Sequence, residues 1–112
     1  MALPARILRN SGKADKQRRS PAHRKWVRGH ACSACGSTTA VECAHVRNGT
    51  DGGTGIKPSD RWTISLCKDC HGRQHQIGEP AFEKEAGIDM KEMARLFYMS
   101  SPHRFKMEAQ DG

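Results

Sequence analysis

The chain has 112 residues and a formal net charge of +7, with 36% hydrophobic and 5% aromatic residues. A chain of this length forms one small domain, and its low hydrophobic content excludes a large core held together by burial alone. A bound structural metal would supply the missing folding free energy. No stretch is long and apolar enough for a membrane span, so we expect no membrane partner.

The basic charge is concentrated at the amino-terminal end. Residues 1–30 contain nine Lys or Arg and one acidic residue, Asp15. Such a segment is typical of a nucleic-acid partner, although a flexible solubilising tail has the same composition. We expect residues 1–19 to be a flexible basic arm that contacts DNA. The first residues lack the apolar segment of a signal peptide, so we also expect a cytoplasmic protein.

The next segment predicts a helix and a strand. Ser20 is suited to be an N-cap and Pro21 to be the first helical residue, which predicts a helix over 21–28. We expect the polar side chains of this helix to face outward; they are His23, Arg24, Lys25 and Arg28. A run rich in β-branched residues predicts a strand over 38–46, with His45 near its end.

A long glycine-rich loop over 47–60 follows, and loops of this length in small domains are often functional. It leads into a second strand over 61–66 and then a helix over 68–77. His71 and His75 are four residues apart in this helix, so both side chains lie on one helical face.

Two further helices complete the predicted domain. One covers 80–86, and the other starts after the N-cap Asp89 and ends before Pro102. The predicted fold class is α+β. It is organised as a basic arm over 1–19, a zinc-stabilised domain over 20–100 and a frayed tail over 101–112.

Four of the five cysteines form two Cys-x-x-Cys pairs, Cys32 with Cys35 and Cys67 with Cys70. Four thiolates at this spacing are the usual ligand set of a tetrahedral structural zinc ion. A redox dithiol or an iron centre on the same thiolates would be alternatives, but both leave the histidines without a role. We expect Cys43 to be a small packed residue of the first strand rather than a ligand.

The order of the motifs resembles that of a known family. A Cys-x-x-Cys pair, Glu42-Cys-Ala-His45, a glycine loop, Leu66-Cys-x-x-Cys-His71 and His75 are similar to the HNH endonucleases, whose core is the ββα-metal fold. The flanking segments resemble small phage- and prophage-encoded members. The resemblance spans about residues 20–89. It implies a small, treble-clef-like HNH core with short flanking helices, in a bacterial or phage setting.

The resemblance also implies roles for individual residues. His45 would be the general base that takes a proton from the attacking water, a task that suits imidazole near neutral pH. His71 and His75 would bind one divalent ion, Mg²⁺, Mn²⁺, Ni²⁺ or Zn²⁺, which stabilises the leaving 3′ oxygen. Ala44 stands where the family often has a metal ligand. Asp60 would therefore be a replacement ligand, or would occupy the middle position of the HNH motif.

The expected function is a metal-dependent endonuclease that hydrolyses DNA phosphodiester bonds. The alternative is a non-catalytic zinc-finger module that binds nucleic acid through its basic residues. No element clearly reads base edges, and the oligomeric state is not indicated. The candidate phosphate contacts are Arg18, Arg19, Arg24, Lys25, Arg28, Arg47, Lys57 and Arg73.

Overall fold

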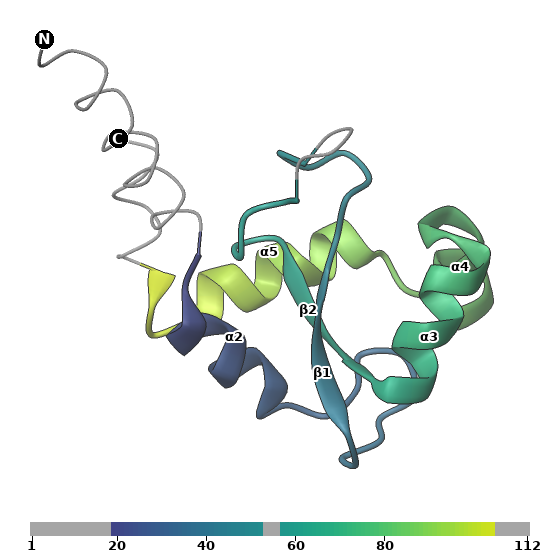
Figure 1. The fold of residues 1–112 in the computed structure, drawn as a ribbon, viewed down its shortest axis with the longest axis horizontal. Helices are drawn as coiled ribbons and strands as arrows, with labels where there is room; N and C mark the ends of the chain where they lie inside the picture. The colour runs from purple at the N-terminus through teal and green to yellow at the C-terminus, as the bar shows by residue number, and fades with distance from the viewer. Residues whose placement is uncertain (1–18, 53–56, 105–112) are drawn as a thin grey trace, which may run out of the picture.

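The computed structural model describes residues 19–52 and 57–104, so residues 1–18 of the predicted arm over 1–19 lie outside this part (Figure 1). The predicted α+β class is confirmed. None of the described helices is long and apolar enough to cross a membrane. The elements in chain order are α2 (Pro21–Arg28), β1 (Val41–His45), β2 (Thr63–Cys67), α3 (Lys68–Ile77), α4 (Glu79–Ala86) and α5 (Met90–Ser100).

Local sequence signals place the helix boundaries. Ser20 caps α2 as predicted, because its side chain accepts a hydrogen bond from the backbone amide of His23. Helix α4 ends at Gly87, which adopts a left-handed φ of 69° that favours glycine. Asp89 caps α5 through the amide of Glu92. The predicted ranges 21–28 and 68–77 agree with the observed bounds of α2 and α3.

The two strands form an antiparallel sheet in which Val41 lies opposite Cys67 and His45 lies opposite Thr63. Every residue of β2 is buried, whereas only Ala44 is buried in β1. Both strands are shorter than predicted. β1 begins only at Val41 because Ala40 has a positive φ of 53°, which interrupts the extended backbone.

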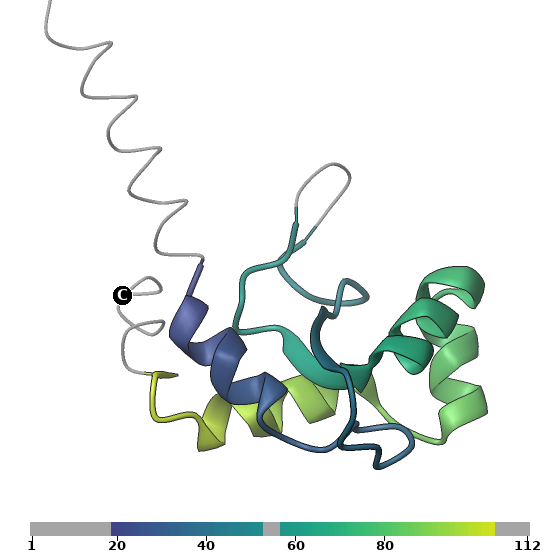
Figure 2. The same ribbon diagram turned by 60° about the horizontal axis from the view of Figure 1, so that its bottom comes forward.

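The helices surround this hairpin. Helix α2 packs against both strands and α5 packs against β2, while α3 and α4 pack together at the end where β2 runs into α3 (Figures 1 and 2). The core is centred on Ile64 and Leu66 and also contains Phe82, Met90 and the cysteines of the hairpin base. The sheet is therefore the support from which β1 and α3 present their polar side chains.

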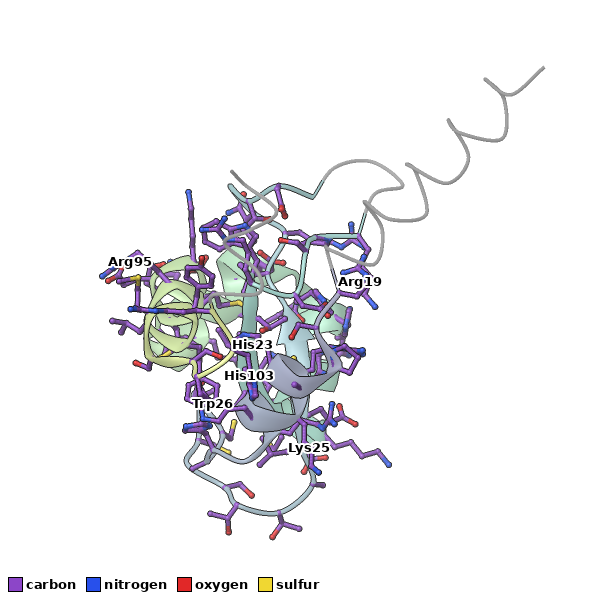
Figure 3. All side chains as sticks on the ribbon, turned by 90° about the vertical axis from the view of Figure 1, so that its left-hand side faces the viewer. Arg19, His23, Lys25, Trp26, Arg95 and His103 are labelled. Carbon is purple, nitrogen blue, oxygen red and sulfur yellow. The ribbon has the colours of Figure 1, made fainter. Side chains whose placement is uncertain are left out.

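A buried histidine joins helix α2 to Ser101, the residue that follows α5. His23 is fully buried and its Nδ1 lies 2.8 Å from Ser101 Oγ. Figure 3 shows His23 beside His103 next to α2, whereas Lys25 points away from the body. The expectation that His23 lies on the surface is wrong, because α5 returns the chain over this face of α2. Ser101, the first residue of the predicted frayed tail, is buried here.

Candidate metal centre and histidine cleft

The structure brings the four cysteines of the two Cys-x-x-Cys pairs together. Their sulfur atoms all lie within 4.8 Å of one another, and Cys35 Sγ is 3.7 Å from Cys67 Sγ. A tetrahedral zinc ion with Zn–S bonds of about 2.3 Å separates its sulfur ligands by about 3.8 Å. The donor set and its spacing therefore fit a structural metal ion such as zinc. Cys32, Cys35, Cys67 and Cys70 are the residues that could hold it.

Three local backbone contacts shape this centre. Gly36 has a φ of 79°, which lets the backbone turn back so that its amide donates to Cys32 O at 2.9 Å. Cys67 is the N-cap of α3, and its sulfur accepts a hydrogen bond from the amide of Cys70. Ser33 ties the first pair to the hairpin through its amide and the carbonyl of Ser65 at 2.8 Å. The two pairs are thus held together by the β2–α3 junction.

The electrostatics of the sulfur atoms also suit a cation. Burial would raise the pKa of Cys32, but hydrogen bonds from the backbone amides of Cys67, Cys35 and Ala34 lower that pKa to about 6. Burial and the neighbouring sulfurs raise the pKa of Cys70. Adjacent thiolates repel each other, and a bound cation would remove that repulsion.

Cys43 lies outside this centre, as expected. It sits on β1, is half-buried, and burial raises its pKa to about 11. Its thiol is therefore inert compared with that of Cys32, and it packs on the same face of the strand as His45.

A second feature is a cleft of about 380 Å³ that His45, His71 and His75 line together. The last turn of α2 forms one wall and the start of the 47–60 loop forms another. Four cationic side chains also line it: Arg24, Arg28, Arg47 and Lys57. The cleft therefore combines imidazoles from β1 and α3 with positive charge from two segments, α2 and the 47–60 loop.

His45 is hydrogen-bonded to a buried carboxylate, that of Asp60. Its Nε2 lies 2.8 Å from Oδ1 of Asp60, which is 1% exposed. Burial would raise the pKa of Asp60, but hydrogen bonds from His45 and the Ser20 amide and the charge of Arg24 lower it to about 2. An ionised carboxylate only accepts hydrogen bonds, so Nε2 carries the proton. In the neutral form of the ring, Nδ1 is then the nitrogen that can accept a hydrogen bond.

Asp60 has its other contacts on the α2 side. Its Oδ2 accepts from the amide of Ser20 at 2.7 Å and lies 3.0 Å from Arg24 Nε, while Arg19 Nη1 lies 3.2 Å from Oδ1. Both carboxylate oxygens are thus engaged. Among the described residues, the cysteines are the only group of three or more potential metal ligands, so Asp60 does not cluster with His71 and His75.

The two histidines of α3 face each other. His71 Nε2 lies 3.1 Å from His75 Nε2, and His71 Nδ1 lies 2.9 Å from Glu42 Oε1. When the Glu42 carboxylate accepts from Nδ1, the neutral ring of His71 has Nε2 as its electron-pair donor, and this atom can accept the hydrogen bond from His75. This is the carboxylate–histidine arrangement that supports metal ligands.

The predicted phosphate contacts do not all meet at the cleft. Arg18 lies outside the described residues, and Arg19 faces Asp60. Lys25 is exposed and points away from the body (Figure 3). Arg73 is on the opposite side of α3, where its guanidinium meets Glu85 at 3.0 and 3.2 Å. Arg24, Arg28, Arg47 and Lys57 are the predicted cations that line the cleft.

Three residues at the cleft were not predicted as site residues from the sequence: Glu42, Gln74 and Glu79. Glu79 is buried and accepts from the amides of Arg47 and Asn48 at 2.7 and 2.8 Å, so it anchors the start of the loop. Glu42 is three residues before His45 in β1, and this proximity was the one available signal. No local pattern distinguishes Gln74 from other polar residues of α3.

Residues 9–102 match a protein family described as "Protein of unknown function (DUF968)". No curated protein and no solved structure matches the chain. The match covers most of the chain, but its description assigns no activity. The function must therefore be inferred from the centre and the cleft.

Proposed function

The chain belongs to the DUF968 family, and we propose that it is a metal-dependent endonuclease of HNH type that hydrolyses DNA phosphodiester bonds. The observation that carries the proposal is the shared cleft of His45, His71 and His75, which four cationic side chains line. A general base, a pair of metal-ligating imidazoles and phosphate-binding charge are the groups that phosphodiester hydrolysis requires.

His45 is the general base in this proposal. Because Asp60 holds the proton on Nε2 at 2.8 Å, Nδ1 is the atom that takes a proton from the attacking water. Asp60 is a positioning residue rather than a metal ligand, since both of its oxygens already have partners. The ion pairs of Asp60 with Arg19 and Arg24 keep it ionised and in place.

His71 and His75 would hold one divalent ion through their Nε2 atoms, with Glu42 fixing the ring of His71. When bound, this ion supplies Lewis-acid stabilisation of the phosphate and of the leaving oxygen. Two protein ligands leave coordination positions open for water and a phosphate oxygen. Mg²⁺, Mn²⁺, Ni²⁺ and Zn²⁺ are the ions to test.

The four-cysteine centre has a structural role in this proposal. Its zinc ion would hold the hairpin base and the start of α3 in one geometry, so that β1 and α3 face each other across the cleft. DNA would approach over α2, whose Arg24 and Arg28 line the cleft.

A supercoiled-plasmid nicking assay across divalent metals tests this function. Wild-type protein should nick the plasmid, and His45→Ala should lower the rate by at least about 100-fold while zinc content and DNA affinity stay the same. Arg73→Ala is a matched surface control, because Arg73 pairs with Glu85 away from the cleft, and it should nick normally. Equal nicking by wild type and His45→Ala would instead indicate the non-catalytic zinc-finger module.

A further inference from the structure

The histidine cleft continues into a second cavity of about 560 Å³. Both cavities are lined by Arg47, Gln74, His75 and Glu79, so they form one groove. We call the second part the extension. It lies between the start of the 47–60 loop and the junction of α3 with α4, and its volume is in the range of small-ligand sites.

The extension differs chemically from the cleft. The cleft is lined by Arg24, Arg28 and Lys57 in addition to Arg47, whereas the remaining lining residues of the extension carry no positive charge. They are neutral or backbone-rich: Asn48, Gly49, Gly52, Gly78 and Pro80. Phosphate is therefore favoured in the cleft, and an uncharged part of the same polymer is favoured in the extension.

Gln74 supplies an unpartnered polar group at the boundary. It is 6% exposed, lines both parts of the groove, and its Oε1 is buried without a hydrogen-bond partner among the described residues. A buried acceptor in this state destabilises the folded protein. The terminal torsion of a glutamine side chain is soft, so the carboxamide can turn to present its oxygen and its NH₂ group to a ligand.

We propose that the extension is a nucleobase subsite in which the Gln74 carboxamide hydrogen-bonds the base next to the scissile phosphate, with adenine preferred. A carboxamide offers one acceptor and one donor side by side, which matches the N6–H and N7 edge of adenine. Glu79 holds the facing loop through the amides of Arg47 and Asn48, so that wall is fixed before the base arrives. This subsite rests on the proposed nuclease function.

The test is to map cut sites on a randomised DNA library with the zinc-loaded full chain and the divalent metal that supports nicking. Wild-type protein should enrich adenine at one fixed position beside the cut. Gln74→Met should reduce that enrichment about fivefold or more. Gln76→Met is the matched control, because Gln76 is exposed on the same helix, and its cut sites should match those of wild type.

Two further readouts separate this role from a structural one. Gln74→Met removes a buried unpaired acceptor, so its melting temperature should equal or exceed that of wild type. Gln74→Glu introduces a carboxylate that only accepts hydrogen bonds. The base enriched beside the cut should then shift from adenine towards cytosine, whose N4 group donates a hydrogen bond. A lower melting temperature for Gln74→Met with unchanged cut sites would assign Gln74 to packing and overturn the subsite.

The two proposals fail in different ways. Cutting by wild type without base preference at any position overturns the subsite and leaves the nuclease function intact. No cutting by wild type with any divalent metal overturns both.

Discussion

The Asp60→Asn variant tests how the proposed base is held. In the structure, the Asp60 carboxylate lies 2.8 Å from His45 Nε2 and also binds Arg24 and the amide of Ser20. An asparagine has nearly the same shape but carries no charge, and its NH₂ group can donate to Nε2. A neutral His45 then carries its proton on Nδ1, and the nitrogen proposed as the base can no longer accept one.

The size of the stability effect follows from the pKa of Asp60, which is lowered from 3.8 to about 2. Because the pKa of Asp60 is lower in the folded state than in the unfolded state, the ionised carboxylate stabilises the fold at pH values above the unfolded-state pKa. This stabilisation is lost as the pH falls from about 3.8 towards 2. The shift corresponds to about 2 kcal/mol at neutral pH. Asp60→Asn should therefore lower the free energy of unfolding by about 2 kcal/mol at pH 7.

Three measurements check this reasoning. Nicking should fall by about 100-fold or more at a temperature where the variant remains folded. Urea unfolding at pH 7 gives the stability change, and ¹⁵N NMR of His45 reports which ring nitrogen carries the proton. Asp51→Asn is the control, because Asp51 binds Ser59 in the same loop through a carboxylate. If Asp60→Asn keeps wild-type nicking and an Nε2-protonated ring, the positioning role is wrong.

Three other predictions concern the metal sites and the buried histidine. Cys67→Ser should remove the bound zinc and unfold the domain, as elemental analysis and circular dichroism will show, whereas retained zinc with native structure would contradict it. Glu42→Gln should weaken divalent-metal activation about 10- to 100-fold through His71, measured by metal titration of nicking. Burial lowers the pKa of His23 from 6.5 to about 4, so the stability it contributes above pH 6.5 should decline by about 3 kcal/mol as the pH falls to 4. Urea unfolding should show a smaller fall in the free energy of unfolding for His23→Gln over the same pH range. Both proteins contain the metal centre, so the difference between them excludes its own acid sensitivity.

Much of the fold was predictable because its signals are local. Ser20 followed by Pro21 determines where α2 begins, and the predicted range of α3 agrees with the observed one. The strands were placed correctly but drawn too long, since the positive φ of Ala40 has no signature in a run of β-branched residues. The grouping of the four cysteines was also predictable, because paired Cys-x-x-Cys spacing has few other uses.

The partners of the site residues were not predictable to the same degree. Asp60 is 15 residues from His45, and Glu42 is 29 residues from His71, so no short pattern connects either pair. Each contact depends on how the loop and the hairpin pack against α2 and α3. His23 shows the same dependence, because its burial is caused by Ser101, 78 residues further along the chain.

The sequence by itself determined the chemistry that the protein carries: four thiols at ligand spacing, two histidines on one helical face and a third at a strand end. These patterns can be recognised in the sequence because each lies within a single helix, strand or turn, where residue spacing determines which side chains are neighbours. The tertiary structure alone decided which groups face one another, including the Asp60–His45 contact, the Glu42–His71 contact and the burial of Gln74 Oε1 without a partner among the described residues. Those contacts join segments whose relative positions are set by packing of the whole domain. Such packing leaves no short repeating pattern in the sequence.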